Sequence, residues 1–414
     1  MIQFIHTADI HFGMENYGRI DPHTGVHSRL LDFEQALNMC VDTAISQEVD
    51  FFLFAGDAYK TANPSPTQQR LLMRCFMRLY RAHIPVIIII GNHDNPLSHG
   101  KAHALDVFAD LPLDGFHVFA KPRLLLLNTK SGPIQIVGIP WPARTNITLA
   151  EKYTHRSAHD ITQHLSATVA AIIQELASQC NPDIPAVLAG HLTVSNGIFS
   201  GSEKRAVYGT DPLFLPSQLA ISPFDYVALG HLHRYQNLNP NGYPAVIYSG
   251  SVERIDFGER KEEKGFCLVK IPEKNKCTHE FILTPTRPFI QINIVLSSNE
   301  NTHTQEILEA IMAHSIEQAV VKIVYHVPAN CRNSVDMNAV HRALSSAHYI
   351  ASIIALKEIP TNRSTRTPLT VSVPFEQLLT EYFKRKPELA SRATQLVEKA
   401  QRLRNELEDS TTTE

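Results

Sequence analysis

The sequence has few features of a secreted or membrane protein. It contains six cysteines and no CxxC pair, and three of the six lie inside apolar runs, which favours reduced thiols in the core over a disulfide framework. The first residues, MIQFIHTAD, lack the basic and long apolar regions of a signal peptide. The most apolar stretch, residues 86–90, is too short to cross a bilayer. We therefore expect a cytoplasmic protein without a membrane partner.

An excess of charge of one sign is also missing. The chain has 38 basic and 41 acidic residues and a net charge of -3, so its overall charge indicates no partner held by bulk electrostatic attraction. A nucleic acid would have to bind through a local basic surface or through metal ions. Histidine, by contrast, is abundant, with 21 among 414 residues. Because imidazole is the commonest metal ligand and titrates near neutral pH, the positions of these histidines matter most.

Residues 1–284 are predicted to form one large α/β domain. Apolar residues at helical spacing predict helices over 27–48, 67–83 and 158–179. Short apolar runs predict strands at 2–7, 51–55, 86–90, 124–128, 134–139, 186–189, 226–229, 245–248 and 265–271. Continuous apolar strands between helices indicate a sheet that is covered on both faces.

The rest of the chain divides into three segments. Residues 285–360 read as strand, helix, strand, helix, strand, which predicts a small separate α+β domain. Its first helix is expected to begin at Thr302, with Gln305 as the capping-box partner. Residues 361–374, rich in Thr, Ser, Arg and Pro, are predicted to be a linker. Residues 375–414 are expected to be helical, with an apolar stripe near heptad spacing that suits docking onto another helix or, alternatively, packing back onto its own domain.

Five segments share one design, in which an apolar strand ends in a polar cluster. They read FIHTADIH, FFLFAGD, VIIIIGNHD, AVLAGH and YVALGHLH. Sites in α/β sheets form at the carboxyl ends of strands, so five strand ends can bring their polar residues to one place. A single GD or GH arises often by chance, whereas all five segments in order do not. The candidate site residues are Asp9, His11, Asp57, Asn92, His93, Asp94, His191, His231 and His233.

These residue types fit a centre of two metal ions. Asp9 and His11 are two residues apart, as are His231 and His233, and in an extended chain residues at that spacing face the same way, so each pair can bind one ion. Mixed oxygen and imidazole donors suit manganese, iron, zinc or cobalt. Two aspartates, one asparagine and four histidines are too many donors for one tetrahedral ion. Two ions that share one carboxylate explain the number.

The joint pattern resembles that of the calcineurin-like metallophosphoesterases over residues 1–280. The resemblance implies an α/β fold, a sandwich of two sheets flanked by helices, with two divalent ions bridged by Asp57. It assigns the other ligands to one ion through Asp9, His11 and His233 and to the second ion through Asn92, His191 and His231. It also implies that His93 protonates the leaving oxygen or stabilises its charge, while Asp94 orients the imidazole.

Within that superfamily the chain looks most like the SbcD family of bacterial nuclease subunits. The segments FIHTADIHFG, AGDAYKTANPSP and YSGSVERIDFGERKEEKGF carry the resemblance, together with the small domain and the helical tail. It implies a manganese-dependent 3′–5′ double-strand exonuclease and single-strand or hairpin endonuclease in DNA repair and recombination. It further implies that residues 285–360 form a capping domain, that an SbcC-type ATPase binds residues 375–414, and that the chain is a homodimer within a heterotetramer.

One position departs from that family. Many members have a histidine three residues after the bridging aspartate, where this chain has Lys60. A lysine can contact phosphate as a point charge, but it cannot replace an imidazole in proton transfer near neutral pH. The candidate DNA contacts are Lys60, Lys204, Arg205, Arg254, Arg260 and Lys261. Two alternatives stay open: another metallophosphoesterase, acting on phosphoproteins, nucleotides or cyclic nucleotides, and a DNA-end scaffold for the ATPase.

Overall fold

The computed structural model describes residues 1–96, 102–110, 112–143, 158–201, 211–358, 379–380, 382–383, 386 and 389–411. The chain separates into two units, Met1–Lys357 and Glu358–Glu414, and each is described by itself. The predicted linker, residues 361–374, lies outside the described residues. In the described part of the chain, no helix is both long and apolar enough to cross a membrane.

The first unit contains two large sheets, and the first of these is built around four parallel strands. Its strand order is β14-β13-β1-β2-β3-β4, in which β1 to β4 run parallel, β13 is antiparallel to β1, and β14 is antiparallel to β13. The carboxyl ends of β1, β2 and β3 therefore lie at one edge. The bounds are β1 Ile2–Thr7, β2 Phe51–Phe54, β3 Val86–Ile89, β4 Phe116–Phe119, β13 Gly265–Glu273 and β14 Lys276–Leu283.

The second large sheet also has a parallel centre. Its order is β11-β12-β10-β7-β6-β5, in which β6, β7, β10 and β12 are parallel and the outer strands β5 and β11 are antiparallel to their neighbours. A two-stranded sheet pairs β8 (Thr193–Val194) with β9 (Leu213–Phe214). The bounds are β5 Arg123–Thr129, β6 Gly132–Ile139, β7 Ala186–His191, β10 Tyr226–Gly230, β11 Gln236–Asn237 and β12 Ala245–Tyr248.

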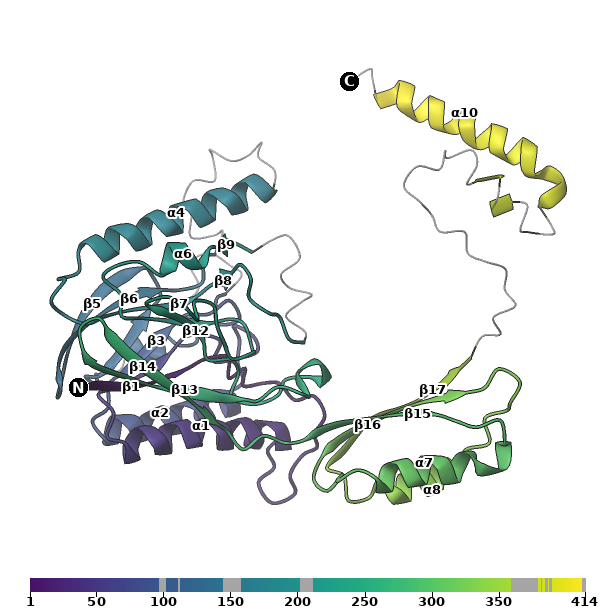
Figure 1. The fold of residues 1–414 in the computed structure, drawn as a ribbon, viewed down its shortest axis with the longest axis horizontal. Coiled ribbons are helices and arrows are strands. Elements are labelled where there is room, and N and C mark those ends of the chain that lie inside the picture. The colour runs from purple at the N-terminus through teal and green to yellow at the C-terminus, as the bar shows by residue number, and fades with distance from the viewer. Residues whose placement is uncertain are drawn as a thin grey trace. The chain divides into compact units, whose positions relative to one another are not determined.

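The two sheets face each other, and helices cover their outer faces (Figure 1). Along β2, Phe51 packs into the core between the sheets, while its neighbour Phe52 packs under helices α1 (Ser28–Ser46) and α2 (Pro66–Arg81). Helix α4 (Ala158–Ser178) covers the second sheet in the same way. Both faces of each central strand are thus buried, which explains the continuous apolar runs. The predicted sandwich of two sheets flanked by helices is confirmed. The short helices are α3 Val107–Asp110 and α6 Pro216–Leu219.

A third, smaller sheet follows in the first unit. Strands β15 (Phe289–Val295), β16 (Val320–Val327) and β17 (Tyr349–Lys357) pair in sequence order, all parallel. Helices α7 (His303–Met312) and α8 (Met337–Ala343) cover one face of this sheet and enclose a core of its own (Figure 1). The predicted strand and helix order of this segment is therefore present, while its independence as a domain stays a prediction.

The predicted cap of α7 is wrong. Thr302 is the N-cap residue, but its side chain makes no capping hydrogen bond. It bonds instead to the Glu306 carboxylate at 2.5 Å, and the Gln305 amide reaches Glu309 at 3.0 Å. The reason is a 3-10 turn, Glu300–Thr302, which precedes the helix and leaves Thr302 in a helical conformation. A capping box requires an extended N-cap residue.

The second unit, in its described part, consists mainly of one helix. A short 3-10 turn, Ala390–Arg392, leads into α10, Ala393–Thr411. Ala393 and Val397, four residues apart, are buried, whereas Leu403 further along the helix is 52% exposed. The helical character predicted for this segment is present there.

A buried arginine ties α1 to the segment that leads into the third sheet. The Arg29 side chain is only 1% exposed, and its guanidinium lies 2.7 Å from the Asp32 carboxylate and 3.7 Å from that of Glu253. It also donates to the carbonyl of Arg254. Asp32 in turn accepts a hydrogen bond from Arg287 at 2.7 Å, just before β15. Because both carboxylates are buried, removal of Arg29 leaves Asp32 with Arg287 alone and takes away the arginine beside the Glu253 carboxylate.

We therefore expect Arg29→Met to destabilise the first unit by about 3–5 kcal/mol, the range for a buried pair that loses one partner. The measurement is the free energy of unfolding from urea titration. The control is Arg74→Met, which breaks a bridge of 3.6 Å to Glu34 from a 61% exposed side chain. Such surface pairs contribute less than about 1 kcal/mol. Equal unfolding midpoints for the two variants would contradict a structural role for Arg29.

Candidate metal centre

The candidate residues lie at the carboxyl ends of strands in both large sheets. Asp9 and His11 follow β1, Asp57 follows β2, and Asn92 follows β3, while His191 ends β7. His231 and His233 follow β10. Main-chain hydrogen bonds join these segments: the amides of Asp9 and His11 donate to the carbonyls of Gly56 and Asp57, each at 3.0 Å. Side-chain hydrogen bonds of Asn92 with His191 and His231 bring the other three stretches to the same edge, between the two sheets.

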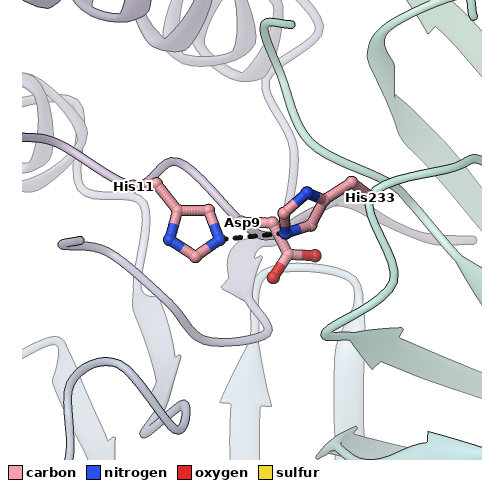
Figure 2. A group of neighbouring side chains, drawn as sticks. All are labelled: Asp9, His11 and His233. Atoms are coloured by element: carbon pink, nitrogen blue, oxygen red, sulfur yellow. Dashed lines mark hydrogen bonds between the residues drawn. The ribbon is translucent and has the colours of Figure 1, made fainter. Parts of the chain in front are cut away.

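A first group of donors consists of Asp9, His11 and His233. Their ligand atoms lie within 4.8 Å of one another, and all three residues are buried. Figure 2 shows the imidazoles of His11 and His233 turned toward each other, with the Nε2 atoms 3.1 Å apart. Two donors at right angles around one ion, each about 2.1 Å from it, are separated by about 3 Å. The spacing therefore fits a shared cation.

A second group consists of Asp57, His191 and His231, again with ligand atoms within 4.8 Å of one another. The Asn92 amide oxygen lies 3.0 Å from His191 Nε2 and 3.0 Å from His231 Nδ1. Asp57 Oδ2 lies 3.3 Å from His191 Nε2 and 3.7 Å from His11 Nε2. The Asp57 carboxylate is thus the group between the two sets, where a bridging ligand would have to be.

The main chain is strained at the ligands themselves. Asp9, His11 and Asp57 have φ angles of 53°, 51° and 59°, and His231 has a φ of 105°. Side chains other than glycine seldom adopt this left-handed region, and such residues concentrate at functional sites. Glycine is required beside them, since a Cβ at Gly91 would lie 2.1 Å from the Asp57 carboxylate. The surrounding fold therefore fixes the donors in place at some cost in stability.

Hydrogen bonds behind the histidines fix which ring nitrogen faces inward. His191 Nδ1 lies 2.8 Å from the carbonyl of Ala55, and His233 Nδ1 lies 2.9 Å from the Glu259 carboxylate. With the proton held at Nδ1 in both rings, each Nε2 lone pair points toward the donor cluster. His231 is turned the other way: its Nδ1 faces Asn92, while its Nε2 is 3.6 Å from the Asp211 carboxylate.

Glu259 and Asp211 were not singled out from the sequence. Glu259 lies in the 3-10 turn Phe257–Glu259, is fully buried, and forms a 2.9 Å ion pair with Lys264. Burial raises its pKa, but Lys264 and His233 outweigh that effect and lower the pKa to about 2. Neither residue directly follows an apolar strand, and although Glu259 lies within the family-like segment of residues 248–266, nothing in that segment assigned it a role.

We expect Glu259→Gln to reduce Mn²⁺ affinity or activity about 10–100-fold, the usual effect of removing a group that orients a ligand. Glutamine keeps the shape of the side chain but loses the charge that holds the His233 N–H. Glu262→Gln is the matched control, because Glu262 also pairs with Lys264, at 3.2 Å, without bonding to His233. Calorimetric Mn²⁺ titration and kcat/KM compare the two. Equal effects would mean that Glu259 acts only on Lys264.

The electrostatics of the cluster favour a bound cation. Burial raises the pKa of Asp9. Burial also acts to raise the pKa of Asp57, but His191 and His11 outweigh it and hold that pKa well below its usual range. Burial lowers the pKa of His191, yet the Asp57 carboxylate raises it to about 9. Carboxylates buried this deeply require positive charge nearby, and divalent ions supply it while leaving the imidazoles neutral. The donor set therefore fits two metal ions.

His93 lies beside the first donor group, and the prediction that Asp94 orients its imidazole is wrong. The residue is exposed, and its ring meets the His11 ring edge-on at 4.9 Å. Its Nδ1 is 2.8 Å from the carbonyl of Lys60, not from Asp94. Asp94 is buried and accepts main-chain N–H bonds from Asp57 at 2.8 Å and Gly91 at 3.1 Å. Asp94 therefore shapes the loops that carry the ligands and does not orient the His93 imidazole.

The described candidate DNA contacts differ in their surroundings. The side chains of Lys60 and Lys261 are exposed, and Arg260 donates to the carbonyl of Phe257 at 3.0 Å. The prediction that Arg254 contacts DNA is wrong. Its guanidinium donates to Thr286 at 2.6 Å and to two carbonyls, so its hydrogen bonds support the fold. Lys204 and Arg205 lie outside the described residues.

The profile of the calcineurin-like phosphoesterases matches residues 2–235, more than half of the chain and all the candidate ligands. The chain belongs to the calcineurin-like phosphoesterases. As a member of that family it is a metal-dependent phosphoesterase hydrolase, with aspartate and histidine groups arranged to hold two ions.

Individual relatives of this phosphoesterase differ in sequence identity and in the share of the chain that they cover. It is 28% identical over 331 residues to the SbcD component of the nuclease SbcCD of Staphylococcus saprophyticus, covering 79% of this chain and 80% of that protein. Among solved structures, TT1561 of Thermus thermophilus is 13% identical with a TM-score of 0.38, covering 68% of this chain and 98% of that one. A dimetal phosphatase from Danio rerio is 11% identical with a TM-score of 0.39 and the same two coverages.

Proposed function

We propose that this phosphoesterase is the nuclease component of an SbcCD-type complex and hydrolyses DNA phosphodiesters. The observation that carries the proposal is the similarity to the SbcD component of a nuclease SbcCD over 331 residues, which extends past the family core of residues 2–235. In this role it would be a 3′–5′ double-strand exonuclease and a single-strand or hairpin endonuclease in DNA repair and recombination. Lys60, exposed beside His93, would then contact phosphate as a point charge.

The proposed ligand assignment follows the two donor groups, with Asp57 shared. Asp9, His11 and His233 would hold one ion, and Asn92, His191 and His231 the other. Manganese suits this mixture of oxygen and imidazole donors. Two such ions, when bound, offset the charge of the phosphoryl group and lower the pKa of a water molecule to near neutrality.

His93 is proposed to transfer a proton to the leaving oxygen. In the imidazolium form both ring nitrogens carry protons, and the carbonyl of Lys60, 2.8 Å from Nδ1, would hold one of them. The Nε2 proton is then the one available for transfer at the open side of the cluster. Asp94 contributes by holding the loop amides around Asp57.

The remaining segments are proposed to serve the complex. Residues 1–284 would be the nuclease domain, 285–360 a capping domain that contacts DNA, and 361–374 a linker. Residues 375–414 would dock an SbcC-type ATPase, with the chain as a homodimer in a cytoplasmic heterotetramer. An exposed leucine supports this role, since Leu403 on α10 is 52% exposed and would lie against a partner helix.

The test is cleavage of end-labelled duplex, hairpin and single-stranded DNA by the full chain with Mn²⁺, with and without the ATPase. Cyclic nucleotides, phosphopeptides and small phosphoesters are assayed in parallel. DNA cleavage that the ATPase stimulates supports the proposal. Turnover of the small substrates alone, with intact DNA, would favour another phosphoesterase. DNA-end binding without turnover of any substrate would favour a scaffold.

Docking is tested separately by pull-down of the ATPase. Leu403→Asp should abolish capture, while Gln395→Asp, at another exposed position of the same helix, should leave it intact. Equal capture by both variants would exclude this apolar stripe as the docking surface.

A further inference from the structure

The only tryptophan of the chain, Trp141, lies beside the second donor group. Its indole is 4.9 Å from the His231 ring at an interplanar angle of 36°, and 6.0 Å from the His191 ring. The residue is half-buried, so part of its surface stays accessible at the site. None of the expected chemistry of the donor cluster requires an indole there.

The main chain around Trp141 is held firmly. It lies two residues after the end of β6, and its amide donates to the carbonyl of Ile90 at 2.8 Å, one residue before the Gly91-Asn92-His93 loop. Buried prolines, Pro140 and Pro142, flank it on both sides. Proline fixes its own φ and restricts the residue before it, so the main chain that carries the indole is restrained before any ligand binds.

Two different rings therefore flank the two donor groups. His93, which can give up a proton, packs against His11 of the first group. Trp141, which has no proton to give at neutral pH, packs against His231 and His191 of the second group. A phosphodiester likewise carries two different substituents on its phosphorus. The leaving group requires a proton donor, whereas the other substituent requires only a surface that positions it.

We propose that Trp141 is a stacking surface for a nucleobase attached to the phosphate bound at the metal centre, an inference that rests on the proposed nuclease function. Every nucleobase has a flat π face, so an indole binds any base without reading its sequence. A peptide phosphorylated on serine or threonine carries no such ring beside its phosphate, and a phosphotyrosine peptide carries a phenyl ring but no base and sugar. We therefore expect a nucleoside to bind on the side of the site where Trp141 lies.

The kinetic test compares two oligonucleotides, one intact and one lacking the base next to the scissile phosphate. Trp141→Ala should raise KM for the intact strand about tenfold, with kcat changed less than about twofold, since stacking contributes to ground-state and transition-state binding alike. Trp141→Phe should recover most of the loss. On the strand lacking the base, wild type and Trp141→Ala should have equal KM.

The control is Tyr80→Ala, which removes another half-buried aromatic ring, stacked on Phe116 away from the donor cluster. It should leave both constants unchanged. Mn²⁺ content is measured in every variant. If Trp141→Ala loses metal, or is equally impaired on both strands, Trp141 only supports its histidine neighbours and the proposal falls. An unchanged KM for the intact strand would overturn it as well.

A binding measurement separates this proposal from the nuclease function. Trp141 is the sole tryptophan, so indole fluorescence of the Mn²⁺-loaded chain reports on this position alone. Nucleoside 5′-monophosphates should quench it saturably, and ribose 5-phosphate should not. If the wild type leaves DNA intact but the quenching persists, the nuclease proposal fails and the base-stacking surface stands. Equal effects of the two phosphates would remove the stacking role whatever the enzyme cleaves.

Discussion

Asp57→Asn should abolish phosphoester hydrolysis and release the metal ions, with a fall in activity of at least about 10³-fold because several kcal/mol of charge stabilisation are lost. Asp57 Oδ2 lies 3.3 Å from His191 Nε2 and 3.7 Å from His11 Nε2, so one carboxylate serves both donor groups. Asparagine keeps the size but removes the negative charge. Its amide N–H also points a partial positive charge at the place of a cation.

The measurement combines Mn²⁺ content by elemental analysis with turnover of DNA and of a chromogenic phosphodiester. Chelation should inactivate the wild type, and added Mn²⁺ should restore wild-type activity but not that of Asp57→Asn. Asp50→Asn is the matched control, since Asp50 is also buried but lies at the other end of β2, where it accepts the amide of Gln3 at 2.8 Å. If the Asp57 variant retained two ions per chain, a shared carboxylate would be excluded.

The convergence of the donors follows from the sequence because each donor comes directly after an apolar strand. Runs such as Phe51–Phe54 could only be buried strands, and the carboxyl ends of parallel strands share an edge. The predicted helix over 67–83 is present as α2, Pro66–Arg81, where the structure adds a capping box of Ser65 and Gln68 that was not predicted from the sequence. These features depend on neighbours in the sequence, where propensity and periodicity apply.

Where the prediction failed, a distant or competing partner decided the outcome. Asp94 was expected to face His93, but several main-chain amides around Asp57 offered it more hydrogen bonds than one imidazole could. Arg254 looked like a free surface cation until the chain before β15 supplied Thr286 as its acceptor. Glu259 reaches His233 only because the Phe257–Glu259 turn folds back over it. None of these contacts follows from a periodic pattern in the sequence.

The left-handed φ angles at the donors could not be predicted either. Nothing in the local sequence requires Asp9, His11 or His231 to adopt them, and glycine would do so at lower cost. The surrounding hydrogen bonds impose the conformation, as when the amide of His231 donates to the Asp9 carboxylate at 3.0 Å. The strain is a consequence of the assembled site, which only the complete fold specifies.

His93→Ala should retain both ions yet lower kcat on DNA about 10²–10⁴-fold, the contribution of a positioned general acid. The main-chain amide of His93, which donates to Asp57 Oδ1 at 2.8 Å, is unaffected by the substitution, so the donor cluster should persist. His23→Ala, at an exposed histidine that belongs to neither donor group, is the control and should change neither metal content nor rate.

Two substrates with different leaving groups test whether the loss of kcat in His93→Ala reflects proton transfer. An alkoxide leaving from DNA requires a proton, whereas p-nitrophenolate leaves readily without one. The loss in His93→Ala should therefore be large on DNA and much smaller on thymidine 5′-p-nitrophenyl phosphate. An equal loss on both substrates would instead assign His93 to charge stabilisation or phosphate positioning. The main-chain carbonyl of residue 60, 2.8 Å from His93 Nδ1, holds the His93 ring. The lysine side chain at position 60 is therefore compatible with a positioned acid at His93.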